Sequence, residues 1–444
     1  MLAARKVALG LFPAALLVAL IAWATGTESV AKAAGVIAAV ALPIGLGAIP
    51  LLRGYQFTAW IVAAVVCPLL FPHAFLNQQI TETISIKINH PWAVLIIIQL
   101  VMFGMGTQMS LRDFAGVAKM PHAVVVGLIC QFTIMPLVGF SIAKVLSFPP
   151  EIGAGLVLIG SCSSGLASNV MAHMAHINLP LSITLTACAT AMAPLVTPFW
   201  LTTLNTGVEK DFSFITAMMS IFKIVIAPIG AAMIHDLLKY PHPNRKRVVY
   251  SFAAAGAAWL LFLLAGGWNV VTDHFTGPVM INTITVVGFL LVAVLTGVIY
   301  HFITLKLHNL DGYMPVFSMF GIIYFTAIAT ASGRNELLAI GLLLCVAAAA
   351  HNTIGYLLGY WLSRLFGLKQ NDARTVAMEV GMQNGGMAFG IANDLGKLAT
   401  LGLAAAIFSP WMNVSGSILA NYWRKHKSKE QKVTQEAAPL AAQD

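Results

Sequence analysis

Apolar stretches recur along almost the whole chain, separated by short polar breaks. Each is about 20 residues long, the length of helix that crosses a hydrocarbon core about 30 Å thick. Backbone N–H and C=O groups in lipid must be paired within the protein, so only helices and closed barrels can span a membrane. The runs are continuous rather than alternating in polarity, which favours helices. Charged residues make up 9% of the chain, against about 25% in soluble proteins. The sequence therefore predicts an all-α polytopic membrane protein.

Fourteen spans can be drawn, and the short loops between them predict a single membrane domain. The expected spans are 6–25, 31–52, 56–76, 91–111, 121–145, 151–176, 180–204, 213–236, 250–271, 279–304, 313–333, 336–364, 373–394 and 398–423. The first follows Arg5 and Lys6, as a secretory signal would, but no clean small-residue cleavage site follows it. Residues 425–444 are polar, and we expect them to form a disordered cytoplasmic tail.

Lysine and arginine residues are distributed unevenly between the two sides of the predicted bundle. If the N-terminus is cytoplasmic, 18 of them lie in inside loops and the tail, and 6 lie in outside loops. Cytoplasmic loops carry an excess of this kind. Both termini are therefore expected in the cytoplasm, as an even number of spans requires, with a bacterial inner membrane as the expected location. The net charge of +9 then reflects topology, so no nucleic-acid partner is expected.

Two polar patches with glycine interrupt the apolar pattern. Residues 161–169 read SCSSGLASN and residues 379–386 read EVGMQNGG. Carboxylates, amides and hydroxyls inside a membrane segment are costly, and they mark functional sites by default. Broken helices at corresponding places in two halves of a chain indicate the binding site of a transporter. The patches therefore predict one ligand site assembled from both halves.

Glu379 is the only acidic residue of the two patches and has no basic partner near it in sequence. A buried carboxylate must be protonated, paired or bound to a cation. Ser182 and Thr186 are one helical turn apart and face the same way, although such hydroxyls often bond only to a backbone carbonyl. Hard cations prefer oxygen ligands. We therefore favour a bound cation over a protonated structural acid.

Lys223 lies near the middle of the span predicted over 213–236. Lysine near a helix end usually extends its amine to the interface, but this residue is about ten residues from either end of its span. Pairing with a carboxylate of the substrate or of the protein is one interpretation, and an interfacial position is the other.

Several motifs, taken in chain order, resemble the bile acid:sodium symporter family. They are CQFTIMP at 130–136, GLASNVM at 165–171, Leu181-Ser182 with Thr186, Pro194 with Thr197-Pro198, His351-Asn352 with Ile354-Gly355-Tyr356, EVGMQN at 379–384 and WMNVSG at 411–416. The resemblance covers roughly residues 55–236 and 313–425.

This resemblance implies ten core helices in two inverted five-helix repeats. The helices would divide into a panel domain and a core domain, with two discontinuous helices crossing in the core. On this basis residues 1–54 form an additional helix pair, 55–204 the first repeat, and 205–424 the second repeat with an inserted pair at 250–304. Packing of the four extra helices on the panel and contact with a second copy in a homo-oligomer are both open.

The resemblance also implies two sodium ions. The first site would use Ser168, Asn169, Ser182, Thr186 and Glu379, and the second would use Gln131, Glu379, Gln383 and the carbonyls of Val380 and Met382. Asn384, Asn413, Met412 and Lys223 are the substrate-binding candidates. Met412 stands where family members often have histidine, so a polar contact to a bile-acid-like substrate is missing here.

The expected function is a sodium-coupled symporter that imports an organic anion, such as a bile-acid-like molecule, a keto acid or another carboxylate, by alternating access. A related arsenite exporter is an alternative, because Cys162 lies in the first broken helix. A non-transporting membrane sensor is another. The chain carries neither a Gly-x-Ser-x-Gly nor a His-Glu-x-x-His motif, and an enzyme is not expected.

Overall fold

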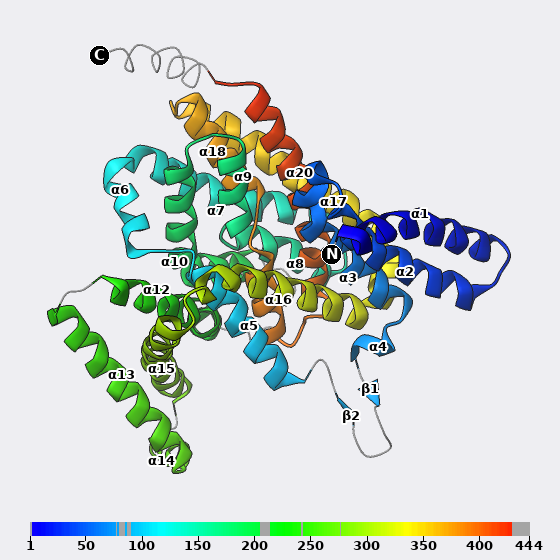
Figure 1. Ribbon diagram of the computed structural model, residues 1–444. Helices are drawn as coiled ribbons and strands as arrows, with labels where there is room; N and C mark the ends of the chain where they lie inside the picture. The colour runs from blue at the N-terminus through cyan, green and yellow to red at the C-terminus, as the bar shows by residue number, and fades with distance from the viewer. Residues whose placement is uncertain are drawn as a thin grey trace.

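The computed structural model describes residues 2–76, 78–79, 85–86, 90–204, 214–240, 243–275 and 277–428. This part of the chain is almost entirely helical (Figure 1). The exception is a two-residue antiparallel pair, β1 (Gln78–Gln79) with β2 (Ser85–Ile86). The prediction of an all-α polytopic membrane protein is confirmed.

The helices before the first break are α1 (Leu2–Ala24), α2 (Glu28–Leu46), η1 (Pro50–Tyr55), α3 (Gln56–Leu70), α4 (His73–Leu76), α5 (Pro91–Gly106), η2 (Leu111–Ala115), α6 (Gly116–Lys119), α7 (Pro121–Val145) and α8 (Pro150–Ser161). After it come α9 (Leu166–Met174), α10 (Leu179–Thr203), α11 (Phe214–Ile221), the π-helical turn η3 (Phe222–Ile226), α12 (Ala227–Lys239), α13 (Pro243–Leu264), α14 (Gly267–His274) and α15 (Pro278–Lys306). The last are α16 (Leu310–Ser332), α17 (Arg334–Leu365), α18 (Gln370–Gly381), α19 (Gly385–Asp394) and α20 (Leu401–Lys425).

Within the described residues, 11 helices are long and apolar enough to cross a membrane, or up to 13 if each of two bent pairs is one span. The bent pairs are α5 with the helical segment over 111–119, and α8 with α9, at angles of 53° and 55°. This count does not include the broken pair α18 and α19, which covers the predicted span 373–394. The total of fourteen spans therefore stays a prediction.

Both breaks are short extended segments next to polar and glycine residues. α8 ends at Ser161, and Cys162 and Gly165 have extended backbone angles. α18 ends at Gly381, Met382 is extended, and Asn384 caps α19. Serine, asparagine and glycine favour non-helical conformations and helix caps over helix interiors. The local sequence therefore explains why each span breaks at this place.

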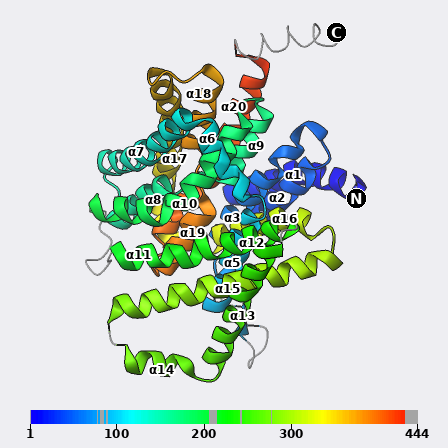
Figure 2. The same cartoon turned by 90° about the vertical axis from the view of Figure 1, so that its left-hand side faces the viewer.

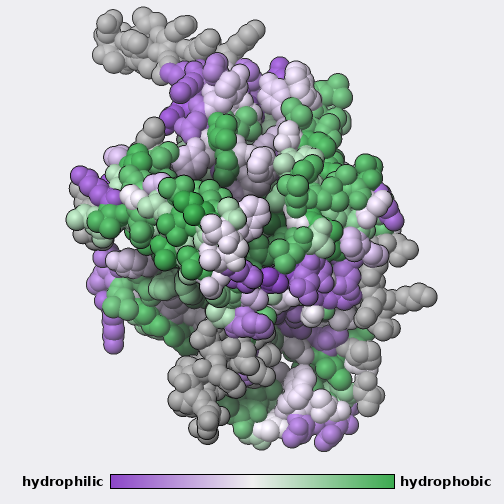
Figure 3. All heavy atoms as spheres, turned by 90° about the vertical axis from the view of Figure 1, so that its right-hand side faces the viewer, coloured by the Kyte–Doolittle hydropathy of each residue, from purple (hydrophilic) through white to green (hydrophobic). Residues whose placement is uncertain are grey.

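The main hydrophobic core surrounds the two broken helices. Leu156, Phe389 and Phe408 are among its fully buried side chains, and they come from α8, α19 and α20. Outside this core, large apolar side chains remain exposed, as expected for helices surrounded by lipid. Figure 3 shows such side chains spread widely over one face of the molecule.

The extra helices form two separate extensions of the bundle, α1–α2 and α13–α15 (Figures 1 and 2). α1 and α2 pack so closely that a Cβ on Gly45 would lie 2.7 Å from the Leu9 Cα. α15 packs on α12, where a Cβ on Gly297 would lie 2.3 Å from the Ala231 carbonyl oxygen. Small residues allow such close approach of membrane helices.

The helix predicted over 250–271 begins earlier and ends earlier, as α13 (Pro243–Leu264). α13 begins at Pro243, so residues 243–249 are helical rather than part of a polar loop. Proline is favoured in the first turn of a helix, and the exposed Arg245 and Arg247 extend from the first turns of α13, outside its apolar part. The division into repeats stays a prediction, and the proposed tail beyond residue 428 lies outside the described residues.

Candidate functional site

The two helix breaks meet inside the core. The Asn384 backbone N–H, in the second break, donates to the Ser163 carbonyl oxygen, in the first, at 2.9 Å. Each break is followed by an α-helix, α9 or α19. The first N–H groups of these two helices have no acceptor within the helix. α7, α10 and α20 pack around the two broken pairs. The tertiary structure thus assembles one site from segments more than 200 residues apart.

Glu379 lies at the centre of this site and is 1% exposed. The hydroxyl of Ser182 donates to its Oε1, and the hydroxyl of Ser164 donates to its Oε2. Thr186 Oγ1 also donates to Oε2, at 2.9 Å. Among the described residues, no lysine, arginine or histidine forms an ion pair with Glu379. The carboxylate is therefore held by neutral hydroxyls from α10 and the first break.

Several neutral polar side chains cluster with the Glu379 carboxylate. Asn169 Oδ1 accepts from Ser182 Oγ at 2.8 Å and from Thr186 Oγ1 at 3.3 Å, and Ser164 and Thr186 hydroxyls are 3.2 Å apart. With the three bonds to Glu379, six oxygen–oxygen contacts share three hydroxyl protons. Such a cluster fits a hard cation, which supplies positive charge to several oxygen atoms at once.

The structure brings most of the first predicted ligand set into direct contact. Asn169, Ser182, Thr186 and Glu379 are joined by the bonds above, and Ser168 is fully buried with its hydroxyl donating to the Gly165 carbonyl at 2.7 Å. Ser164 was not predicted, although it contacts Glu379. It lies in the quoted SCSSGLASN segment, but nothing in the sequence distinguishes it from Ser161 or Ser163.

The second predicted set is a linked group of amides. Gln131 Nε2, on α7, donates to Gln383 Oε1 at 3.0 Å and to the Cys162 carbonyl at 3.1 Å. Gln383 Nε2 donates to the Val380 carbonyl at 2.7 Å. In the described structure Gln131 Oε1 is buried without a hydrogen-bond partner. A buried oxygen of this kind needs an explanation, and a cation ligand is one.

Asn384 lies in the second break and Met412 contacts the break from α20, whereas Asn413 bonds within α20. Asn384 Oδ1 accepts from the Met387 N–H at 3.0 Å and so caps α19. Met412 Sδ is 3.3 Å from the Gln383 N, and Asn413 Nδ2 donates to the Ser409 carbonyl at 2.7 Å. The hydroxyl of Ser409 is buried without a described partner. A Cβ on Gly385 would lie 2.2 Å from it, so this hydroxyl is beside the first residue of α19.

Lys223 is not joined to this group by any hydrogen bond or ion pair in the described structure. It lies in η3, where its backbone carbonyl accepts from Gln99 Nε2 at 3.3 Å. The next residue, Ile224, faces α19, since a Cβ on Gly390 would be 3.0 Å from its Cγ2. The predicted substrate role of Lys223 therefore stays a prediction. The half-buried lysine is on a neighbouring element rather than at the break itself.

The thiol of Cys162 is fully buried, and the residue takes part in the site through its backbone carbonyl. The site has no cluster of three or more histidine, cysteine and acidic side chains suited to a transition metal, and the rest of the described chain has none either. Its donors are hydroxyl, amide and carboxylate oxygens, which is the chemistry of alkali and alkaline-earth ions.

Proteins with similar sequences are named as sodium-dependent transporters. The sequence pattern of the sodium bile acid symporter family matches residues 95–266, which include Gln131 and Ser182 but not Glu379. The uncharacterized sodium-dependent transporter YocS of Bacillus subtilis (strain 168) is 30% identical over 379 residues, covering 85% of this chain and 94% of that protein.

More distant relatives have related names. The probable chloroplastic sodium/metabolite cotransporter BASS1 of Arabidopsis thaliana is 25% identical, over 74% of this chain and 66% of its own length. The human ileal sodium/bile acid cotransporter is 27% identical, over 65% of each chain. Together with the extent of the match to the Bacillus protein, these similarities show that the chain belongs to the sodium bile acid symporter family, whose members are sodium-dependent transporters.

Proposed function

We propose that this protein is a secondary transporter that imports an organic anion together with two sodium ions by alternating access. The observation that carries the proposal is the buried Glu379 carboxylate. It accepts hydrogen bonds only from neutral hydroxyls, next to the Asn169 amide, at the meeting point of two broken helices. A buried carboxylate in a membrane protein requires compensation, and sodium offers it.

Charge balance links the ions to the substrate. Two sodium ions beside one carboxylate leave a net charge of +1 in a region of low dielectric. The N-terminus of α19 adds the positive end of a helix dipole. The N–H groups of Gly385 and Gly386, in the first turn of α19, have no acceptor within the helix, and the Ser409 hydroxyl is buried beside them without a described partner. We propose that these groups face the carboxylate. A monoanion would neutralise the loaded site, so substrate and ions favour each other's binding.

The break also connects the two sites mechanically. Gln383 is a ligand candidate for sodium, and the next residue, Asn384, caps the helix that would face the anion. A sodium ion that orders residues 380–383 therefore also places Asn384 and the first turn of α19. This arrangement supports coupled rather than independent binding.

Alternating access requires the broken helices to move against their neighbours. α5 covers α19 closely, since a Cβ on Gly386 would lie 3.1 Å from Val101 Cγ1. Asn384 Nδ2 is 3.7 Å from Met105 Sδ on the same helix. Separation of α5 from α19 would open the site, as expected for rigid-body movement around a fixed site.

The excess of lysine and arginine in one set of loops supports cytoplasmic positions for both termini, and we propose a bacterial inner membrane as the location. A homo-oligomer stays a prediction. The names of the relatives concern bile acids and unspecified metabolites, and we propose carboxylates as the substrate class.

Flux into proteoliposomes tests the proposed function. We expect an inward sodium gradient to drive accumulation of at least one anion from a panel of bile acids, keto acids and other carboxylates, and sodium alone to raise the unfolding temperature. Sodium-independent efflux of arsenite that is lost in Cys162→Ser would overturn the proposal. Absence of both flux and sodium stabilisation would favour a sensor.

Ser164→Ala tests whether Ser164, which the sequence does not single out, contributes to the proposed sodium site. The substitution removes one hydroxyl from Glu379, and hydrogen bonds to charged groups contribute about 1.5–3 kcal/mol. We expect sodium affinity, measured by thermal shift, to fall about tenfold or more. Ser161→Ala is the control, because that hydroxyl is equally buried but bonds only to the Leu158 carbonyl. Equal sodium affinity in the two variants would exclude Ser164 from the site.

Gln131→Leu tests the number of ions. The change removes the unpaired amide oxygen and keeps the side chain near its original volume. We expect the dependence of uptake on sodium to change from cooperative to hyperbolic, because one of two ion sites is lost. A Hill coefficient that is unchanged from the wild type would show that Gln131 holds no coupled ion.

A further inference from the structure

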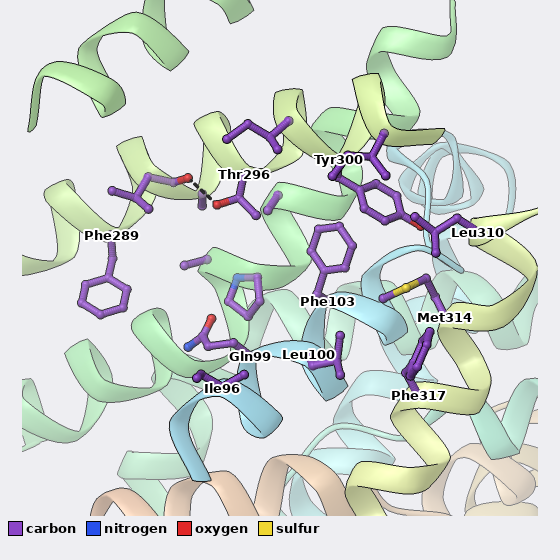
Figure 4. A pocket seen from close by; sticks show the side chains of 17 residues that line it. Ile96, Gln99, Leu100, Phe103, Phe289, Thr296, Tyr300, Leu310, Met314 and Phe317 are labelled. Atoms are coloured by element: carbon purple, nitrogen blue, oxygen red, sulfur yellow. Dashed lines mark hydrogen bonds between the residues drawn. The ribbon is translucent and has the colours of Figure 1, made fainter. Parts of the chain in front are cut away.

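A cavity outside the proposed transport site lies where the inserted helix α15 meets α5, α12 and α16. Its volume is about 610 Å³. Phe103, Phe289, Ala293, Thr296, Tyr300 and Met314 are among the lining residues, and Figure 4 shows how the side chains gather around it. α15 forms one wall. The cavity therefore depends on a helix that the sequence predicted to be an insertion.

The cavity is apolar and open toward the lipid-facing surface. Ile96, Ile299 and Phe317 line it and are 64%, 50% and 43% exposed. The hydroxyl of Thr296 bonds back to its own helix, at the Val292 carbonyl. Gln99 Nε2 donates to the Lys223 carbonyl oxygen. These walls suit a hydrocarbon chain rather than a hydrated anion.

The length of the cavity can be judged along α15. Phe289 and Ile303 both line it and are separated by 14 residues, which is about 21 Å along a helix axis. This is the length of an extended acyl chain of about 16 carbon atoms and exceeds half of a hydrocarbon core of about 30 Å. A tilted acyl chain from one leaflet fits such a channel.

One end of the cavity is polar and close to basic residues. Tyr300 lines the cavity and donates its hydroxyl to Asp311 Oδ1 at 2.8 Å. Lys239 Nζ forms an ion pair with Asp311 Oδ2, also at 2.8 Å. Lys306 follows the lining residue Ile303 by one turn and is exposed. The polar end of the cavity therefore lies at the same end of the bundle as Lys239 and Lys306.

More positive charge lies at this end. α12 ends at Lys239 and α13 starts at Pro243, so Arg245, Lys246 and Arg247 lie in the first turns next to it. Five basic residues thus lie at the ends of α12, α13 and α15, and one of them, Lys239, pairs with Asp311. Basic clusters between membrane helices at the cytoplasmic surface bind anionic lipid headgroups.

We infer that this cavity is a binding site for an anionic glycerophospholipid. One acyl chain occupies the apolar channel, and the phosphate lies against Lys306 and the basic start of α13. The charge at one end selects an anionic headgroup, and the channel length selects a long chain. Because α15 forms one wall, the lipid also holds the inserted helices against α5 and α16. This site does not depend on the proposed sodium or substrate sites.

Native mass spectrometry of the full-length protein tests the inference, with phosphatidylglycerol and phosphatidylcholine as probes in detergent. We expect bound phosphatidylglycerol on the wild type, with about tenfold preference over phosphatidylcholine, and a higher unfolding temperature when it is added. Ala293→Phe fills the cavity from a side chain that is 9% exposed, and should abolish both effects. Ala255→Phe, on the exposed surface of α13, is the matched control.

A charge variant keeps the test independent of changes inside the cavity. Lys306→Gln with Arg245→Gln alters two exposed side chains and should weaken phosphatidylglycerol binding about fivefold for each charge removed. Lys144→Gln is the control, on an exposed side chain far away in sequence. Equal lipid retention in the Ala293→Phe and Ala255→Phe variants would overturn the inference. Equal binding of the two lipids would also overturn the inference. A dimer that Ala293→Phe disrupts and Ala255→Phe does not would likewise overturn it, because a second copy of the chain would then cover the cavity.

Discussion

Replacing Glu379 with glutamine is expected to abolish sodium-dependent uptake and the rise in unfolding temperature that sodium produces. The amide keeps the volume of the side chain but removes the negative charge at the centre of the oxygen cluster. Removing one partner of a buried charged pair typically costs about 2–5 kcal/mol, which corresponds to a loss of about 30-fold or more in sodium affinity. Thermal unfolding over a sodium titration measures this loss directly.

The same variant separates loss of binding from loss of folding. In sodium-free buffer, Glu379→Gln should unfold at the same temperature as the wild type or at a higher one, because an uncompensated buried charge is destabilising. Glu336→Gln is the control, on an exposed side chain in the first turn of α17. A Glu379→Gln protein that retains wild-type sodium stabilisation would remove the basis of the proposed function.

Gly160→Val is expected to destabilise the protein and to weaken sodium binding together. A Cβ on Gly160 would lie 2.6 Å from the Met135 carbonyl oxygen and 3.1 Å from His351 Cε1. That carbonyl accepts from His351 Nε2 at 2.8 Å. The clash is with backbone, so it is relieved only if α7 and α8 separate. Overpacking of this kind costs about 1–3 kcal/mol.

Separation of these helices would also displace ligand candidates of the proposed ion site. Gln131 is one turn before Met135, and its bond to the Cys162 carbonyl bridges α7 and the first break. A lower unfolding temperature and a lower sodium affinity should therefore occur in the same variant. Gly230→Val is the matched control, because a Cβ on Gly230 would have no atom within 4 Å. Similar unfolding temperatures for the two valine variants would show that the α7–α8 contact adapts without cost.

The positions of the helix breaks could be predicted from residues 161–169 and 379–386, because helix propensity and capping are local properties. The start of α13 could not, because the charged residues 245–247 read as loop and only the packed helix showed otherwise. Ser164 could not be separated from Ser161 and Ser163 by residue type. The direction of each hydroxyl depends on where the break places it.

The class of protein and its family follow from the amino-acid sequence alone. Lipid as a solvent imposes continuous apolar helices, and the ordered motifs around Ser182, Glu379 and Asn413 point to sodium bile acid symporters. The packed fold determines which oxygens meet at Glu379, because Ser164 is 215 residues away in sequence. It also decided that α15 closes a lipid-facing cavity. Hydropathy is a property of each segment alone, whereas a ligand set depends on how helices from both halves of the chain cross.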